Sequence, residues 1–307
     1  LPLATFAMET YADDPCELFI PRTTAGDTIY DAKTVRLIAQ MHKAISIVQY
    51  KLEGDIIRRR PEFEMDDRLL LHRINLEKGT IRLNGQDYEL KDKNWPTLDP
   101  KDPYRLSIDE EDMIRRIQRS FEGSEKLRKH MLCLFRHGSM YKVCNSNLLF
   151  HASVPMNSDG TLKEVKVDGE CFKGKALLDK VDQLVRTAYF DPEDSPQKQF
   201  AMDYIWYLWC GKDSPLFDKS RMATFERCFL ADKELQKEEK GAYYSLREEE
   251  AICDRLLDEF GVTGEHRHIV NGHVPVRSIK GENPIKANGK LIVIDGGFSK
   301  AYHSETG

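Results

Sequence analysis

Several features that place a chain in a special class are missing from this sequence. There is no apolar run of about 18 residues or more, which excludes an ordinary transmembrane helix. The first residues lack the basic and then apolar pattern of a signal peptide, so we expect a cytoplasmic protein without a membrane partner. The net charge is −5 and no basic stripe occurs, which argues against a nucleic-acid partner.

Cysteine pairs are missing as well. The seven cysteines are odd in number and form no Cys-x-x-Cys motif. Most stand in apolar contexts, such as Cys133 within Met131-Leu132-Cys133-Leu134-Phe135. We therefore expect buried free thiols rather than disulfides or zinc ligands.

The composition is that of an ordinary globular protein, with 40% hydrophobic and 32% charged residues in 307. Helical patterns dominate residues 1–135, where the sequence also predicts a β-hairpin. Short strands in residues 136–160 and 262–307 are expected to belong to one core sheet, separated by a helical insertion at 161–261. The predicted fold class is therefore α/β, in the α+β sense of helical blocks beside a sheet.

Local motifs define several of these elements. Asp31 to Arg60 has apolar residues three or four apart and is predicted to be an amphipathic helix, and Met65 to Ile74 a second, short one. Asn84-Gly85 supplies the positive φ angles of a two-residue hairpin turn. Capping boxes at Ser107-Ile108-Asp109-Glu110 and Ser245-Leu246-Arg247-Glu248 predict two helix starts.

Two β-branched runs near the C-terminus are the candidates for carrying a site. Ile269-Val270-Asn271-Gly272-His273 and Leu291-Ile292-Val293-Ile294-Asp295 read as adjacent buried strands, each stopped by Gly or Pro. An earlier hairpin around Asn145-Ser146-Asn147 leads into a strand that ends at His151. The strand ends would deliver His151, His273 and Asp295 to one sheet edge, although a core position for His151 remains an alternative. For His137, before this hairpin, a capping role and a functional role stay open.

The loop between the last two strands carries four cations, Arg277, Lys280, Lys286 and Lys290. Such a loop can hold an anion beside a metal through backbone donors and charge-assisted bonds. A solvated turn is the alternative. We take Arg277, Lys280 and Lys286 as candidate contacts for a substrate phosphate.

Several phrases, spread over most of the chain, resemble class III fructose-1,6-bisphosphatase, a large bacterial enzyme type within the calcineurin-like metallophosphatases. The matching phrases are His137-Gly138-Ser139-Met140-Tyr141-Lys142-Val143, Asn147-Leu148-Leu149-Phe150-His151, Trp206-Tyr207-Leu208-Trp209, Ser214-Pro215-Leu216-Phe217, Thr224-Phe225-Glu226-Arg227 and Asn271-Gly272-His273-Val274-Pro275-Val276, with Asp295-Gly296-Gly297 after them.

This resemblance implies part of a calcineurin-like β-sandwich with large helical insertions. It also implies hydrolysis of fructose 1,6-bisphosphate to fructose 6-phosphate in gluconeogenesis, at a two-metal centre holding Mn²⁺ or, as second choice, Mg²⁺. His151 and His273 would be metal ligands. The partners would be a small sugar bisphosphate and, in a homo-oligomer, further copies of the chain.

The pattern also departs from that family. The motifs Gly-Asp-x-His, Gly-Asp-x-x-Asp-Arg-Gly and Gly-Asn-His-Asp/Glu, which carry the other ligands and the catalytic residues, do not occur here. We therefore expect the catalytic residues upstream of Leu1, in a longer enzyme of which this chain is the C-terminal part, and an inactive chain on its own. The alternatives are a non-catalytic scaffold or regulatory fragment, and a calcineurin-like phosphatase for another phosphorylated substrate.

Overall fold

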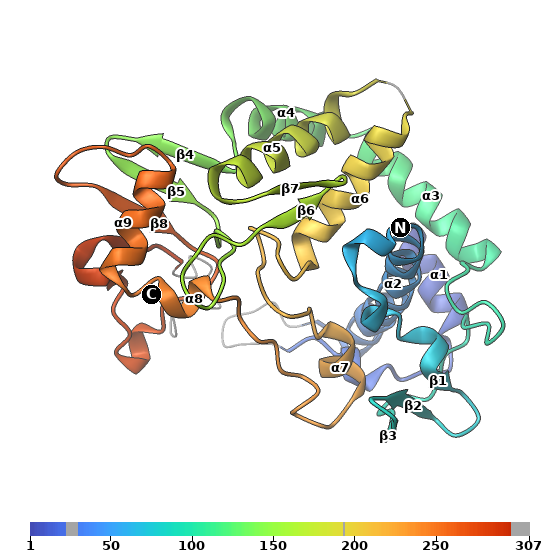
Figure 1. Cartoon of the computed structure of the whole chain (residues 1–307). Helices are drawn as coiled ribbons and strands as arrows, with labels where there is room; N and C mark the ends of the chain where they lie inside the picture. The colour runs from blue at the N-terminus through green and yellow to red at the C-terminus, as the bar shows by residue number, and fades with distance from the viewer. Residues whose placement is uncertain (23–29, 193, 296–307) are drawn as a thin grey trace. The chain divides into compact units, whose positions relative to one another are not determined.

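The computed structural model describes residues 1–22, 30–192 and 194–295 and has an α/β fold (Figure 1). The chain divides into two units: residues 1–132 with 223–237, and residues 133–222 with 238–307. Residues 223–237 thus belong to the first unit, although the sequence predicts them to lie within the helical insertion at 161–261. Across the described helices, no segment has both the length and the apolar character needed to span a bilayer.

The first unit is mainly helical and has a small antiparallel sheet. Its elements are α1 (Pro2–Thr10), η1 (Glu17–Phe19), α2 (Ala32–Arg59), η2 (Pro61–Phe63), η3 (Asp66–Arg68), η4 (Leu71–Arg73), β1 (Ile74–Asn75), β2 (Thr80–Leu83), β3 (Gln86–Glu89), α3 (Ile108–Glu122) and α7 (Thr224–Phe229). Helix α4 (Glu125–His137) begins in this unit and ends in the second.

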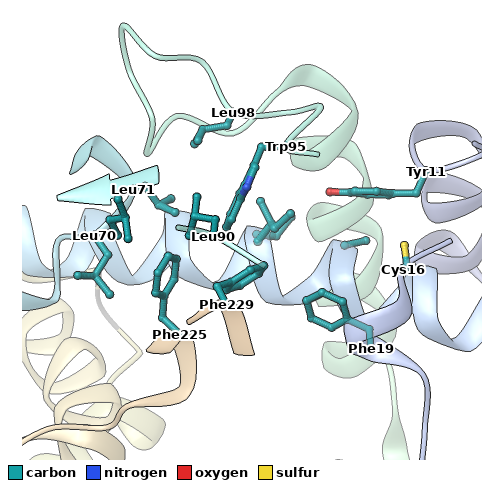
Figure 2. Close-up of a cluster of buried hydrophobic side chains, with 14 of the residues drawn as sticks. Tyr11, Cys16, Phe19, Leu70, Leu71, Leu90, Trp95, Leu98, Phe225 and Phe229 are labelled. Carbon is teal, nitrogen blue, oxygen red and sulfur yellow. The ribbon is translucent and has the colours of Figure 1, made fainter. Parts of the chain in front are cut away.

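An aromatic cluster explains why residues 223–237 belong to the first unit. Phe225 and Phe229 lie one turn apart on α7 and pack against Trp95, with ring centroids of Trp95 and Phe229 4.7 Å apart (Figure 2). All three side chains are buried. Arg68 adds a two-pronged ion pair with Glu226, at 2.6 and 2.9 Å. The return of the chain through α7 therefore completes the core of this unit.

The second unit contains the mixed sheet and its covering helices. Its elements are β4 (Tyr141–Cys144), β5 (Asn147–Phe150), β6 (Val165–Val167), β7 (Glu170–Phe172), α5 (Gly174–Phe190), α6 (Pro196–Cys210), α8 (Tyr243–Leu246), α9 (Glu250–Glu259), β8 (His268–Asn271), η5 (Ser278–Lys280), β9 (Ile285–Lys286), η6 (Ala287–Gly289) and β10 (Leu291–Val293). Within the described residues, the larger sheet has five strands in the order β4-β5-β8-β10-β9.

Strands β5, β8 and β10 run parallel, with Leu148 opposite Ile269 and Leu291 on the other side of Ile269. Strand β4 pairs antiparallel with β5, and α9 lies beside β8 (Figure 1). Because parallel strands end at the same edge of a sheet, the residues after β5, β8 and β10 come together. This edge carries the candidate site.

Several local predictions are confirmed. Helix α2 begins after Asp31, whose carboxylate accepts a hydrogen bond from Thr34 N at 2.8 Å. The capping box of Ser107 and Glu110 starts α3. The Asn84-Gly85 turn joins β2 and β3, with φ angles of 49° and 79°.

Two helix predictions were wrong. Met65 to Ile74 forms the short turns η3 and η4 instead of one helix, because the chain leaves the helical path at Leu69 and buries the adjacent Leu70 and Leu71. Ser245 caps no helix: it lies inside α8, where burial of Tyr243 and Tyr244 favours a separate turn. Helix α9 starts later, after Glu249.

The expected free thiols are confirmed, but their burial was only partly right. Cys16, Cys210 and Cys253 are buried, whereas Cys133, Cys144 and Cys171 are exposed. Cys133 lies on α4, none of whose residues is buried, so its apolar neighbours in the sequence do not enclose it.

Candidate functional site

His151 and His273 meet at the edge where β5 and β8 end. His151 directly follows β5, and His273 is the second residue after β8. His151 Nε2 lies 3.2 Å from His273 Nδ1, and the ring centroids are 5.1 Å apart. The parallel pairing of the two strands therefore brings residues 122 positions apart in the sequence into contact.

Backbone and side-chain hydrogen bonds fix this pair. Gly272 N donates to His151 O at 2.8 Å. Asn271 Nδ2 donates to Ala152 O at 3.1 Å and to the hydroxyl of Tyr243 at 2.7 Å. Asn271 and Tyr243 are both buried, so the loop after β5, the end of β8 and helix α8 are held together beneath the imidazoles.

The electrostatic environment keeps both imidazoles neutral. Burial lowers the pKa of His151, against the opposing field of Asp295. Burial, followed by the fields of His151, Lys219 and Lys240, lowers the pKa of His273 to about 4. A neutral imidazole has the lone pair that a metal ion requires, whereas an imidazolium does not.

The donor geometry fits two ligands of a single metal ion. Two nitrogens bound at about 2.1 Å lie roughly 3.0–3.4 Å apart in octahedral or tetrahedral geometry, and the observed separation is 3.2 Å. His273 Nε2 is buried and lacks a hydrogen-bond partner in the described part of the chain. Within residues 1–22, 30–192 and 194–295, however, no group of three or more His, Cys, Asp or Glu residues could hold a metal. The pair is therefore a partial ligand set.

Aromatic rings enclose His273. The centroid of Phe217 lies 6.3 Å and that of Tyr244 6.4 Å from the centroid of His273. The Tyr244 hydroxyl donates to Phe217 O at 3.2 Å, which ties the two rings to each other. The loop that ends in Ser214-Pro215-Leu216-Phe217 thus reaches the candidate site.

A pocket opens beside His151 on the side of β4. Its volume is about 360 Å³, and its lining includes His137, Leu149, His151 and Leu216. His137, at the end of α4, therefore shares a pocket with His151 without entering the histidine pair.

The model of the Firmicute fructose-1,6-bisphosphatase family matches residues 1–307. The chain belongs to this family. A class 3 fructose-1,6-bisphosphatase of Parabacteroides distasonis is 71% identical over 307 residues, one of Phocaeicola vulgatus 67% over 308, and one of Clostridium botulinum 53% over 307. Each alignment covers 100% of this chain and 46% of the relative, so the chain spans about half the length of these relatives. The comparison with solved structures found no significant match.

In this member of the fructose-bisphosphatase family, two of the three cations suggested for phosphate binding, Arg277 and Lys286, lie near the carboxylate of Glu282, whose pKa is lowered by the Arg277 amide and by the fields of both cations. Lys286 pairs with Glu248. Arg277 is exposed and its amide donates to Glu282 at 2.9 Å, and Lys280 is exposed on η5. Among the described residues, no hydrogen bond or ion pair joins any of the three to His151 or His273. Gly296 and Gly297 of the family phrase lie outside the described residues.

Sequence reasoning missed Lys219, Lys240 and Arg247, the cations nearest to the aromatic rings around His273. Lys219 Nζ lies 5.1 Å from the Phe217 centroid, and Lys240 Nζ and Arg247 Cζ lie 5.9 and 5.5 Å from that of Tyr244. Lys240 belongs to a charged run, Lys233 to Lys240, that appears only as an exposed face in the sequence. The only hint in the sequence is that Lys219 follows shortly after Phe217, the last residue of the family motif Ser214-Pro215-Leu216-Phe217.

Asp218, next to Phe217, is a buried carboxyl close to the candidate site. It is 3% exposed, and its Oδ2 accepts a hydrogen bond from Ser153 Oγ, two residues after His151. Burial raises the pKa of Asp218 to about 6. As the pH falls, the folded state therefore takes up this proton at a higher pH than the unfolded state does. The contribution of this group to stability is fully present below its ordinary pKa and is lost as the pH rises to about 6.

We expect Asp218→Asn to stabilise the protein above about pH 6. The amide retains an acceptor for Ser153 and suits the left-handed backbone of residue 218, whose φ is 48°. The free energy of unfolding should rise by about 1–3 kcal/mol at about pH 8 and change little at about pH 4. Urea unfolding at both pH values checks this. A variant that is less stable than the wild type at about pH 8 would show that the charged carboxylate is needed.

Proposed function

We propose that the protein to which this chain belongs hydrolyses fructose 1,6-bisphosphate to fructose 6-phosphate and phosphate, a step of gluconeogenesis. The observation that carries the proposal is the 3.2 Å separation of His151 Nε2 and His273 Nδ1 at the end of two parallel strands. Family membership supports the substrate, since the relatives bear the name of this activity. We also propose that this enzyme is cytoplasmic and belongs to the calcineurin-like metallophosphatases.

His151 and His273 would hold one ion of a two-metal centre, with Mn²⁺ preferred and Mg²⁺ second. Imidazole nitrogen beside oxygen ligands suits an ion of intermediate hardness such as Mn²⁺. When bound, such a pair of ions supplies charge neutralisation at a phosphoryl group and a nucleophile at neutral pH. The remaining ligands must come from residues other than the two imidazoles, so we propose that the chain alone is inactive.

The chain's own residues orient the ligands and limit water. Asn271 and Gly272 hold the two imidazole-bearing loops at a fixed spacing. Phe217 and Tyr244 cover His273 and lower the local polarity, which strengthens the interaction between charged groups there. Arg277 and Lys280 remain proposed contacts for a substrate phosphate, together with Lys286 if its pair with Glu248 opens.

The test is an assay of the protein produced from its complete gene. Phosphate release is measured with Mn²⁺ and with Mg²⁺ on fructose 1,6-bisphosphate, a sugar monophosphate, a nucleotide and a phosphopeptide. We expect fructose 1,6-bisphosphate to have the highest kcat/KM, and Mn²⁺ to support it best. Preference for the nucleotide or the phosphopeptide would contradict the substrate, and no release from any of them would favour a scaffold role.

A further inference from the structure

The guanidinium of Arg247 has two buried donors that find no acceptor among the described residues. The residue follows α8 and is 6% exposed. Its Nε and Nη1 are buried and have no hydrogen-bond partner in the described part of the chain. A guanidinium stays charged in proteins, and leaving its donors unpaired away from water is costly. The position is therefore suited to an anion that none of the described residues supplies.

Further cations gather around the same aromatic rings. Lys240 Nζ lies 5.9 Å from the centroid of Tyr244, the ring that Arg247 also contacts. Lys219 and Lys240 are partners in an antiparallel β-bridge. Burial, with the fields of Arg247, Lys219 and Arg277, lowers the pKa of Lys240. Four positive charges therefore converge on a small region.

The carboxylates nearby do not saturate these cations. Glu238 lies 3.3 Å from Lys219 Nζ, and Glu282 accepts from the amide of Arg277. Asp218 accepts a hydrogen bond from Ser153. None of the three supplies an acceptor to Arg247 Nε or Nη1. The region retains a positive excess together with two unpaired guanidinium donors.

This region adjoins the histidine pair. The Tyr244 ring is close to both groups: its centroid lies 5.5 Å from Arg247 Cζ and 6.4 Å from the centroid of the His273 ring. The fields of Lys219 and Lys240 reach His273, whose pKa they help to lower. An anion bound here would thus lie beside the same aromatic ring as the candidate metal ligand His273.

We propose that Arg247, with Lys240 and Lys219, binds the second phosphate of a sugar bisphosphate, the one that is not hydrolysed. A phosphate monoester carries close to two negative charges at neutral pH and has three oxygens that accept charge-assisted hydrogen bonds, which suits this cluster of cations better than a carboxylate does. The exposed side chain of Lys240 marks the side from which the phosphate enters. This inference rests on the proposed function. It explains why the enzyme would prefer a sugar bisphosphate to a substrate with one phosphate.

The kinetic test compares substrates with and without a second phosphate. For the complete protein, kcat/KM is measured for fructose 1,6-bisphosphate and for p-nitrophenyl phosphate, and the ratio of the two is the readout. Arg247→Gln should lower this ratio about tenfold to a hundredfold, the effect of losing one or two charge-assisted hydrogen bonds. Arg247→Lys should recover part of it. An unchanged ratio in Arg247→Gln would overturn the proposal.

Lys240→Ala is a second test that does not depend on whether the Arg247 variants fold. Lys240 is exposed, so its replacement should leave the fold intact. It should lower the ratio about fivefold to tenfold, the range of one charge-assisted contact that is partly screened by water. Lys237→Ala is the matched control, since Lys237 is equally exposed and pairs only with Glu234 in the described residues. Equal ratios in Lys240→Ala and Lys237→Ala would contradict the role of Lys240.

A binding measurement separates this inference from the proposed function. Calorimetry with inorganic phosphate on the complete protein carrying His273→Ala should give a Kd that Arg247→Gln raises about tenfold. If the wild type hydrolyses no bisphosphate, the function fails while this phosphate site stands. If the bisphosphate is hydrolysed and Arg247→Gln alters neither the ratio nor the Kd, the site fails alone. Loss of phosphate binding with an unchanged ratio would assign the site to free phosphate and overturn the substrate role.

Discussion

Replacing His273 with alanine is expected to lower kcat for fructose 1,6-bisphosphate by about a thousandfold in the complete protein. Losing one of two imidazole ligands removes the site for one metal ion, and about 4 kcal/mol of lost transition-state stabilisation corresponds to that factor. Alanine at the left-handed φ of 67° costs only about 1 kcal/mol, which is too little to explain the loss by backbone strain. Steady-state kinetics at saturating Mn²⁺ measure the effect.

His268→Ala is the matched control for this prediction. His268 lies on the same strand, β8, but its Nδ1 faces Gly289 O at 2.9 Å and not the histidine pair. Its replacement should leave kcat within about threefold, as for a substitution away from the site. If His273→Ala retained more than about a tenth of the wild-type kcat, or if both variants lost activity equally, His273 would not be a metal ligand.

Replacing Lys51 with methionine is expected to lower the opening free energy of the amides in α2 by about 3–5 kcal/mol, because it leaves Glu110 charged and uncompensated in the core. Lys51 Nζ donates to Glu110 Oε2 at 2.7 Å and to Thr97 O at 2.6 Å. Both charged side chains are completely buried. Hydrogen–deuterium exchange of peptides around residue 51 reports the change for this unit by itself.

A second substitution shows whether the uncompensated charge is the cause. Glu110→Gln in the Lys51→Met background removes the charge and keeps the capping-box bond to Ser107 N, since glutamine also serves at this position. The double variant should recover about half of the lost protection or more. Lys93→Met, which breaks the exposed pair with Glu89, should leave the protection of these amides unchanged. A double variant no better than Lys51→Met would indicate a packing defect instead.

Features specified by a few neighbouring residues could be predicted from the sequence. The Asn84-Gly85 turn, the cap at Asp31 and the capping box at Ser107 each depend on contacts within four residues. The contact between His151 and His273 could be predicted for a different reason: each residue follows a strand, and parallel strands end at the same edge of a sheet. The pattern of short apolar runs and the family resemblance both pointed to this edge.

Features that depend on distant residues could not be predicted. Ser245 and Glu248 have the spacing of a capping box, but burial of the neighbouring tyrosines decides where the helix begins. The sequence separates Lys219 from Arg247, and long-range contacts such as the Lys219–Lys240 bridge and the bond from the Tyr244 hydroxyl to Phe217 O bring them to the same region. The return of α7 to the aromatic cluster of the first unit likewise has no local signal.

The central claim is that His151 and His273 bind one metal ion together. The most direct test is a crystal structure of the complete protein grown with Mn²⁺, with diffraction data collected at wavelengths on both sides of the manganese absorption edge. We predict an anomalous peak about 2.0–2.3 Å from both His151 Nε2 and His273 Nδ1. A manganese peak at other residues, with these two nitrogens bonded only to each other, would contradict the account.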